Sequence, residues 1–283
     1  MTGFIEYYKI GEKENFDLAQ INPRDKGLFD SREQAEAFTI EAVEKIKNLQ
    51  YQVFVEGKQS LLIVLQAPDA AGKDGLIRNV LGQMNPQGCR TYSFKVPSSL
   101  ELSHDFLWRI HAAAPAAGMV SIFNRSHYED VLVVRVENLA PQEVWRRRYD
   151  HINAFESLLH DRGTKVLKFY LHISPEEQLQ RFGERLTDPQ KHWKLNAGDY
   201  AARDNWDAYR QAYHDAFANC SPDHAPWFVI PADRKWHRNA AVAGIVLQAL
   251  EEMNPQLPAV DVDVDEIRQL YEKAKQELAV KRQ

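Results

Sequence analysis

Residues 66–75 combine a carboxylate, a lysine and glycines at the end of an apolar run, and this combination suits phosphate chemistry. The run Leu61–Leu65 stops at a short loop, and Gly72 and Lys73 stand where a helical pattern begins. Backbone N–H groups at a helix start attract anions, and a lysine beside them neutralises terminal phosphates. Asp69 stands in the same loop, where a carboxylate repels phosphate unless a divalent cation lies between them. The loop therefore predicts a metal-dependent phosphoryl-transfer site.

This loop departs from the usual phosphate-loop pattern at two positions. Ala67 stands at the first glycine position, and Asp74 replaces the serine or threonine that usually follows the lysine. Simpler alternatives exist for both charged residues, since Asp69 also suits a helix cap and Lys73 a surface lysine. The preceding apolar run and the glycines favour the phosphate interpretation. In it, the residues that bind phosphate beside Lys73 are Ala70, Ala71, Gly72, Asp74 and Gly75.

A second group of chemical residues follows the third apolar run of the chain. Many phosphate-loop enzymes close this strand with an aspartate that holds magnesium, but this chain has Asn124, so Asp69 would supply the negative charge. Arg125 offers a planar fork that matches phosphate oxygens. His127 is a metal ligand or base in one interpretation, but a lone histidine is more often structural. Glu129 either stabilises a helix start or contacts metal or nucleotide, and the sequence leaves both alternatives open.

A basic segment later in the chain has the composition of a closing lid. Arg181 and Arg185 are four residues apart and share one helix face, while Lys191 and Lys194 follow in a polar loop. Converging cations on a mobile segment are what a lid over phosphate requires. A solvated helix face explains the same residues, and the phosphate loop at residues 66–75 favours the lid.

Apolar runs and helical patterns alternate along most of the chain, which predicts a three-layer α/β fold with a parallel sheet. Ligands in such folds bind at the carboxyl ends of the strands, where the residues above stand. The predicted strands are Leu61–Leu65, Thr91–Lys95, Val120–Phe123, Val166–Ile173 and Trp227–Ile230. The predicted helices are Arg32–Leu49, Lys73–Leu81, Leu100–Ala114, Pro141–His160, Pro175–Leu186, Tyr200–Phe217, Asn239–Met253 and Glu266–Val280.

The overall composition bounds the class of protein. The chain has 283 residues and a formal net charge of -5, which argues against general nucleic-acid binding. No apolar run is long enough to span a membrane, and no signal peptide is visible. Two cysteines are too few for a disulfide framework, so we expect a cytoplasmic protein. We expect residues 1–58 to form an N-terminal helical extension packed on the core, residues 59–255 the core with a lid at 181–200, and residues 256–283 a helical tail.

Six ordered motifs between Leu61 and Met253 resemble those of the family-2 polyphosphate kinases. The resemblance implies a P-loop kinase fold related to thymidylate kinases, with a five-stranded parallel sheet and a helical lid. It also implies magnesium-dependent transfer of a terminal phosphoryl group between inorganic polyphosphate and a nucleotide, with manganese as a substitute. The motifs are Asp69–Gly75, Asn85–Gly88, Phe94–Pro97, His104–Arg109, Phe123–Asp130, and Asp188-Pro189 with Trp193-Lys194.

The resemblance also assigns roles to individual residues. Lys73 and Arg125 would act on the phosphates, and Asp69 would hold magnesium, with Asn124 as a candidate second ligand. The lid cations Arg181, Arg185, Lys191 and Lys194 would follow the polyphosphate chain. The implied partners are inorganic polyphosphate, adenine or guanine nucleotides, and further copies of the chain in a dimer or tetramer. The residues expected to bind the nucleotide are Lys95, Arg109, Asn124, Tyr128 and Glu129.

The segment Asn124–Asp130 resembles the branch of the family that accepts both nucleoside mono- and diphosphates, which favours AMP and ADP. An ATP-dependent kinase for a nucleotide or another small molecule is the first alternative, and Asp74 counts against it. A nucleotide-sensing switch with little turnover is the second. The acids Asp69 and Glu129 and the lid count against inert binding.

Overall fold

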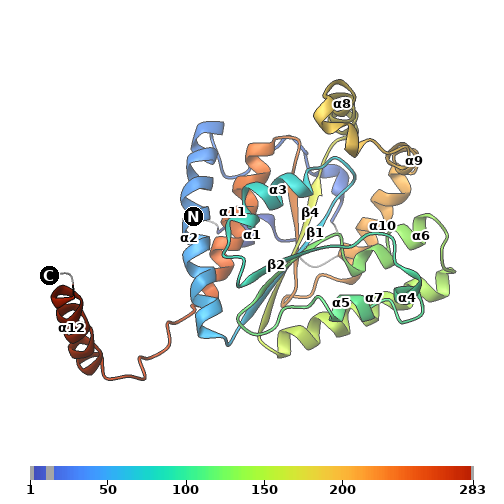
Figure 1. Ribbon diagram of the computed structural model, residues 1–283. Helices are drawn as coiled ribbons and strands as arrows, with labels where there is room; N and C mark the ends of the chain where they lie inside the picture. The colour runs from blue at the N-terminus through green and yellow to red at the C-terminus, as the bar shows by residue number, and fades with distance from the viewer. Residues whose placement is uncertain (1–2, 11–15, 282–283) are drawn as a thin grey trace.

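Five strands form a sheet at the centre of the molecule (Figure 1). The structure is a computed structural model that describes residues 3–10 and 16–281. The predicted three-layer P-loop kinase-like architecture with an all-parallel sheet is confirmed. The strands are β1 (Ser60–Gln66), β2 (Cys89–Ser93), β3 (Val120–Asn124), β4 (Thr164–His172) and β5 (Trp227–Pro231).

The strand order β2-β3-β1-β4-β5 places β1 at the middle of the sheet. All its residues are buried, which explains its unbroken apolar run. Leu65 pairs with Asn124 of β3, and Gln66 pairs with Tyr170 of β4. The carboxyl ends of β1, β3 and β4 therefore meet at one edge of the sheet, where ligands bind in folds of this kind.

Alternate residues of β1 bury into two different layers. Leu61, Ile63 and Leu65 belong to the core that the sheet shares with one helical layer, and Leu62 and Val64 to the core shared with the other. This alternation follows from the period of two in a strand. The first layer contains α1 (Phe4–Tyr8), α2 (Arg32–Glu56), α3 (Lys73–Asn79) and α11 (Lys235–Met253), and the second contains α5 (Trp108–His111), α7 (Gln142–Asp161) and α10 (Trp206–Asn219).

Helix α2 lies against α11, so the N-terminal segment is part of the first layer. Ser31 caps α2 through a hydrogen bond from the backbone N–H of Gln34 (3.2 Å), and Gly57 ends the helix with φ of 67°. Gly244 of α11 lies against the Phe4 ring, where an added Cβ would stand 2.4 Å from the ring. A glycine there lets α1 approach α11 closely.

Two predicted helices are divided in the structure. Leu100–Ala114 was expected as one helix, but α4 (Ser99–Leu102) and α5 are separated by a turn in which Asp105 accepts a hydrogen bond from Leu107 N (2.9 Å). Tyr200–Phe217 divides at Asn205 into α9 (Gly198–Asp204) and α10. A short polar side chain competes for backbone hydrogen bonds, so Asp105 marks the first break; Asn205 makes no such side-chain bond.

Apart from the last helix, the remaining described elements are two α-helices and four 3-10 helices. α11 begins at Lys235, four residues before the predicted start at Asn239. The other elements are α6 (Val133–Val136), α8 (Pro175–Thr187), and the 3-10 helices η1 (Leu18–Gln20), η2 (Leu81–Gln83), η3 (His127–Asp130) and η4 (Pro189–Lys194).

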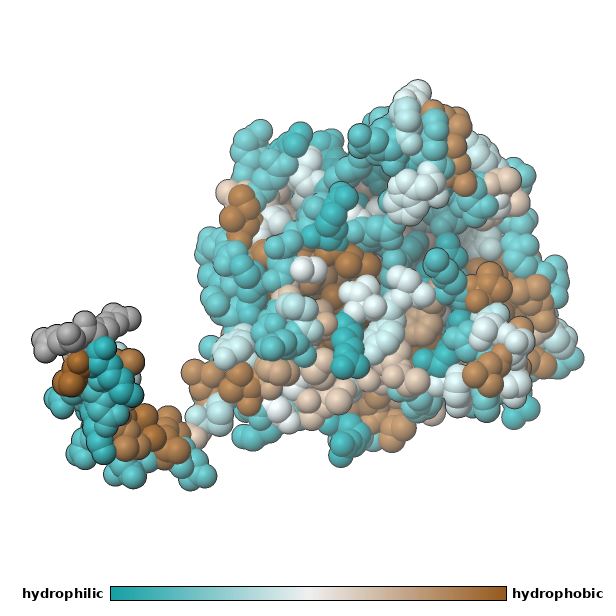
Figure 2. All heavy atoms as spheres, in the orientation of Figure 1, coloured by the Kyte–Doolittle hydropathy of each residue, from teal (hydrophilic) through white to brown (hydrophobic). Residues whose placement is uncertain are grey.

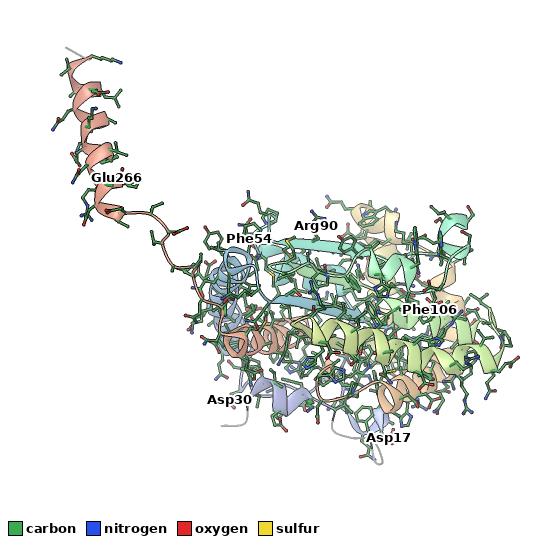
Figure 3. The ribbon with its side chains drawn as sticks, turned by 90° about the horizontal axis from the view of Figure 1, so that it is seen from below. Asp17, Asp30, Phe54, Arg90, Phe106 and Glu266 are labelled. Atoms are coloured by element: carbon green, nitrogen blue, oxygen red, sulfur yellow. The ribbon has the colours of Figure 1, made fainter. Side chains whose placement is uncertain are left out.

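The last helix, α12 (Val264–Val280), stands apart from the body of the molecule (Figure 1). Residues 256–281 are all exposed. The view from below shows Glu266 on this arm, well away from Phe54 of α2 (Figure 3). Apolar patches are visible on the arm in Figure 2. None of the helices in the described part of the chain is long and apolar enough to cross a membrane.

Candidate active site

The loop after β1 turns sharply through two residues with positive φ, Ala70 (63°) and Gly72 (103°). Gly72 is the N-cap of α3, a position that suits glycine because a Cβ disfavours this backbone geometry. The loop therefore folds over the end of β1, between the ends of β3 and β4.

Lys73 bends back over this loop. Its Nζ donates a hydrogen bond to the carbonyl oxygen of Ala67 (2.8 Å), and only 9% of the residue is exposed. Burial lowers the pKa of Lys73, against the attraction of Asp69. A buried ammonium that donates only to a neutral carbonyl among the described residues is well placed to take a phosphate as its partner.

Asp69 and Arg125 meet across the ends of β1 and β3. Arg125 Nη2 lies 2.8 Å from Asp69 Oδ1, and Arg125 Nη1 lies 4.0 Å from Glu129. Arg125 has a φ of 62°, and its backbone N–H donates to Leu65 O of β1 (3.1 Å). This backbone contact fixes the arginine beside the phosphate loop, so the structure brings together three predicted site residues.

A polar chain joins β3, α3 and the lid through Asp74. Asn124 Nδ2 donates to Asp74 Oδ1 (3.0 Å), and Lys194 Nζ contacts Asp74 Oδ2 (3.3 Å). Burial opposes ionisation of Asp74, but these two hydrogen bonds and the charge of Lys194 lower its pKa overall. Asp74 therefore occupies the position after the lysine as a carboxylate that a lid cation can reach.

The lid arginines differ in what they contact. Arg181 of α8 is buried, and all five of its N–H groups point at protein acceptors: Glu177 and four backbone carbonyls of the loops after β1 and β5. Arg185 is held by Asp199 (2.7 Å) and lies in the cleft wall. Arg181 thus holds the phosphate loop in place, and a contact with phosphate would have to replace one of these bonds.

These residues line a cleft of about 680 Å³ at the carboxyl edge of the sheet. Among the described residues, ten basic side chains line it against three acidic ones, so it is strongly positive although the chain is negative overall. The basic residues are Lys73, Arg78, Lys95, Arg125, Arg181, Arg185, Lys191, Lys194, Lys235 and Arg238, and the acidic ones are Asp69, Asp74 and Glu184.

Two of the residues predicted to bind nucleotide lie elsewhere. Arg109 does not line the cleft, and its Nη1 donates to the backbone oxygen of Lys95 (2.9 Å), so it positions Lys95. Tyr128 is fully buried and donates its hydroxyl to Glu156 (2.9 Å). Its burial gives no support to the expected contact between Tyr128 and nucleotide, which stays a prediction.

Tyr128 belongs to a buried polar cluster behind η3. Lys168 Nζ contacts Glu156 (2.5 Å), the Tyr128 hydroxyl (2.9 Å) and Cys220 O (2.7 Å), and His127 lies 3.2 Å from Glu156. All four side chains in this cluster are fully buried. Burial lowers the pKa of His127, so a structural role fits it better than a metal or base role.

A narrow apolar pocket of about 70 Å³ adjoins the cleft and shares Asp69 and Arg125 with it. Glu129 lies in its wall, while aromatic side chains from α10 and β4 supply much of its surface. None of these aromatic residues was predicted as a site residue from the sequence, although the three from α10 recur on one face of a helical pattern. The aromatic residues in the wall are Tyr170, Trp206, Tyr209 and Tyr213.

The described residues contain no group of three or more His, Cys, Asp or Glu side chains that would hold a metal by themselves. Magnesium usually binds one or two carboxylates, substrate phosphates and water. Asp69 and Asp74, both in the cleft wall, fit that arrangement. Phosphoryl-transfer enzymes of this type generally use such a divalent cation.

The parallel sheet, the phosphate loop after β1 and the cationic lid after β4 define a P-loop kinase-like phosphotransferase. A family model described as "Polyphosphate kinase 2 (PPK2)" matches residues 29–258. The chain belongs to the polyphosphate kinase 2 family, and it is a kinase-type enzyme, as the motifs predicted.

Three similar proteins illustrate the relationship. The AMP/ADP-polyphosphate phosphotransferase of Meiothermus ruber is 46% identical over 264 residues, which cover 93% of this chain and 99% of the relative. The ADP-polyphosphate phosphotransferase of Rhodopseudomonas palustris is 38% identical over 264 residues, which cover 89% of this chain and 91% of that relative. The crystal structure of polyphosphate kinase 2 from Arthrobacter aurescens TC1 has a TM-score of 0.93 at 42% identity, with 96% of this chain and 97% of that chain covered.

Proposed function

We propose that this enzyme transfers the terminal phosphoryl group of inorganic polyphosphate to AMP and ADP, reversibly and with magnesium. The observation that carries the proposal is the junction of two cavities at the Asp69–Arg125 pair. One cavity is long and cationic, which suits a polyanionic donor. The other is narrow and aromatic, which suits a nucleoside. The names of the similar proteins from M. ruber and R. palustris support the same substrates.

In this proposal the donor lies along the cleft. Lys73 binds the terminal phosphate after leaving the Ala67 carbonyl, and Arg185, Lys191 and Lys194 bind phosphates further along the chain. Lys95 extends the same track from the end of β2. Charge neutralisation of this kind reduces the repulsion between two polyanions, which is the main barrier in phosphoryl transfer.

The acceptor nucleoside would enter the pocket beside α10, with its phosphate directed toward Arg125. The pocket is small for a nucleoside, so entry requires α9, which contributes Ala202 to the wall, to move outward. An oxygen of the acceptor phosphate then attacks the terminal phosphorus of the donor, and the bond to the next phosphate breaks. The shortened polyphosphate leaves with the bridging oxygen, and no strong base is needed because the attacking oxygen is already anionic.

Asp69, with Asp74 or Asn124 nearby, would hold the magnesium, and manganese could replace it in the same oxygen environment. A bound divalent cation neutralises charge on the transferred phosphoryl group. Arg125 would be released from Asp69 when the carboxylate takes a cation, which frees its planar fork for phosphate oxygens.

The test is nucleotide turnover by purified protein with magnesium and polyphosphate as the only donor. ADP and ATP formed from AMP would support both parts of the proposal. ATP formed from ADP while AMP is untouched would remove AMP as an acceptor, and parallel reactions with GMP and GDP would define the base. Transfer from ATP but not from polyphosphate would overturn the proposal in favour of an ATP-dependent kinase.

We also propose that the chain forms a homo-oligomer through α12. Ile267, Leu270, Tyr271 and Leu278 are exposed at helical spacing and form an apolar stripe. The first half of the arm is rich in acids and the second half carries more lysines than acids. Two copies packed antiparallel would bury the stripes and oppose these charges.

The oligomer proposal is tested by light scattering on full-length variants. Ile267→Asp with Leu270→Asp places charge on the stripe and should lower the measured mass. Gln269→Asp lies on the other face of the helix and serves as the matched control. Equal masses for both variants and the unaltered protein would refute a role for this stripe.

A further inference from the structure

Arg238, in the first turn of α11, is a buried cation that has no carboxylate partner among the described residues. Only 3% of the residue is exposed. Burial and the neighbouring charge of Arg181 lower its pKa to about 10. A buried charge is costly unless it is paired, so the position of this guanidinium requires an explanation.

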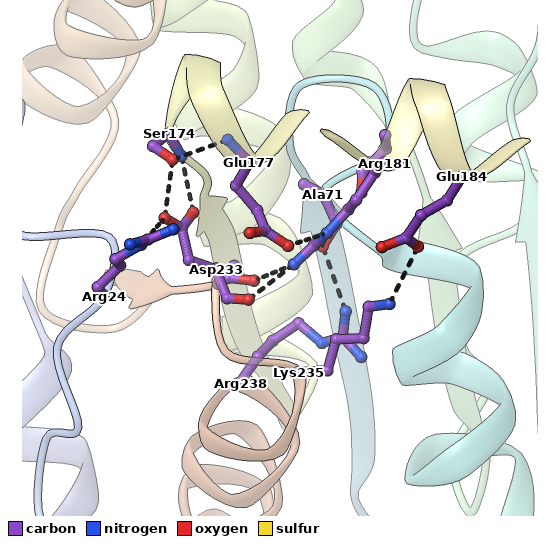
Figure 4. A network of polar contacts seen from close by, with 11 residues as sticks. Arg24, Ala71, Ser174, Glu177, Arg181, Glu184, Asp233, Lys235 and Arg238 are labelled. Atoms are coloured by element: carbon purple, nitrogen blue, oxygen red, sulfur yellow. Dashed lines mark hydrogen bonds and ion pairs between the residues drawn. The ribbon is translucent and has the colours of Figure 1, made fainter. Parts of the chain in front are cut away.

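The protein holds the Arg238 guanidinium in a fixed direction without neutralising it. Asn239 Oδ1 accepts from Nε (3.2 Å) and Nη2 (2.8 Å), and Ala71 O accepts from Nη1 (3.2 Å). One N–H on each terminal nitrogen is left with no acceptor among the described residues. Arg181 differs, since it reaches the same Ala71 carbonyl but has Glu177 as a counter-ion (Figure 4).

The guanidinium lies directly against the turn of the phosphate loop and forms part of the cleft wall. A Cβ added to Gly72 would stand 1.9 Å from Arg238 Nη1, and one added to Gly75 would stand 3.6 Å from Nη2. Gly72 therefore leaves room for the arginine as well as allowing the positive φ. The helix prediction that began at Asn239 left this residue out of the site.

We propose that Arg238 binds oxygens of the phosphate group that occupies the loop, and that this phosphate is the missing counter-ion. The inference rests on the proposed function, because it needs a phosphate-containing substrate in the cleft. The two available N–H groups match the fork geometry of arginine–phosphate contacts. Arg238 is then a substrate-binding residue on the α11 side of the loop, opposite Arg125, which follows β3.

The test measures binding of inorganic tripolyphosphate to the full-length protein by calorimetry, without nucleotide. Arg238→Gln should raise the dissociation constant at least tenfold, and Arg238→Lys should raise it less because the charge remains. Arg234→Gln, a matched control outside the cleft on the turn before α11, should stay within twofold. In turnover, Arg238→Gln should raise the KM for polyphosphate and leave the KM for AMP unchanged.

A second measurement separates substrate binding from a structural role. Tripolyphosphate should raise the melting temperature of the unaltered protein and raise that of Arg238→Gln far less. If Arg238→Gln does not fold, Asn239→Ala decides, because it removes the acceptor that directs the guanidinium and should weaken binding several-fold. Unchanged tripolyphosphate affinity in a folded variant would overturn the inference alone. Failure of the unaltered protein to bind tripolyphosphate would overturn the proposed function as well.

Discussion

Lys73 and Asp69 of the phosphate loop have opposite charges, so each suits a different partner: an anion for Lys73 and a cation for Asp69. The Lys73 ammonium rests on a carbonyl, which a phosphate oxygen can replace, while Asp69 is paired with an arginine that a divalent cation can replace. In the proposed reaction we expect the loop to exchange these internal contacts for substrate contacts.

Replacing Lys73 with methionine tests the value of its charge. We expect kcat/KM for polyphosphate to fall by about two to three orders of magnitude, roughly 3–4 kcal/mol of transition-state stabilisation, because a buried phosphate contact is lost. Steady-state kinetics with polyphosphate and ADP measures the effect. Lys58→Met changes an exposed lysine outside the cleft and should have little effect; comparable losses in both variants would contradict the prediction.

The lowered pKa of Lys73 predicts a pH dependence of binding. Burial favours the neutral amine, so Lys73 loses its proton at a lower pH than an ordinary lysine does. Phosphate needs the ammonium form, and tripolyphosphate affinity should therefore decline as pH rises through the lowered pKa. Calorimetry in buffers of different ionisation enthalpy should show proton uptake on binding in that range. Absence of both effects, or their persistence in Lys73→Met, would contradict this assignment.

At the residue scale, the sequence predicted the loop, Asp69, Lys73 and Arg125 correctly as neighbours, because strand ends in a parallel sheet meet at one edge. It did not predict the burial of Tyr128, since that burial depends on the distant residues Glu156 and Lys168. The assigned roles in catalysis stay predictions until the variants are measured.

At the scale of elements, the buried cluster connects η3 to α7 and β4. Glu156 of α7 and Lys168 of β4 form a fully buried ion pair that also holds the side chains of His127 and Tyr128. Only Ser126 separates these two residues from Arg125, so the cluster fixes the segment that carries this arginine and Glu129. A pair far from solvent thereby positions residues at the site.

Replacing one member of this ion pair should lower the free energy of unfolding far more than replacing both members together. Lys168→Met alone should destabilise the protein by about 3–5 kcal/mol because Glu156 is left as an unpaired buried charge. Lys168→Met combined with Glu156→Gln should recover a large part of that loss. Urea unfolding of both single variants and the double variant measures the coupling. Additive losses would show that the two charges do not depend on each other.

The sequence predicted which helices and strands occur more reliably than it predicted where each one begins and ends. All five strands were predicted, although β2 spans Cys89–Ser93 and so begins and ends two residues earlier than the predicted Thr91–Lys95. The division of the expected Leu100–Ala114 helix depends on a local hydrogen bond of Asp105, which apolar periodicity does not report. No capping side chain in the sequence indicated that α11 begins at Lys235, so the predicted helix started after Arg238.

At the scale of the whole molecule, charge is separated between the cleft and the rest of the surface. The chain is negative overall, but ten basic side chains gather in one cleft among the described residues. A local positive field attracts a polyanion while the net charge keeps the protein from binding anions everywhere.

This separation predicts a strong dependence on ionic strength. Raising the salt from about 0.05 to 0.5 M should raise the KM for polyphosphate severalfold, because screening shortens the reach of the cleft charges. The KM for AMP should change much less, since its nucleoside would bind in an apolar pocket. Initial rates in potassium chloride and in potassium acetate would separate screening from specific chloride binding. Equal sensitivity of both constants would contradict the assignment of the two cavities.

The wall shared by the two cavities has a consequence for the geometry of successive transfers. A nucleoside fixed at one point presents its attacking oxygen one phosphate unit further along in ADP than in AMP. A donor whose single reactive phosphate is held at a fixed distance from the nucleoside pocket would reach the attacking oxygen of only one of these two acceptors. Polyphosphate is a repeating chain, and it can shift its register by one unit along a track of similar cations. In the proposed reaction, the repeat of the donor would thus compensate for the growing length of the acceptor, and one set of side chains would serve both steps.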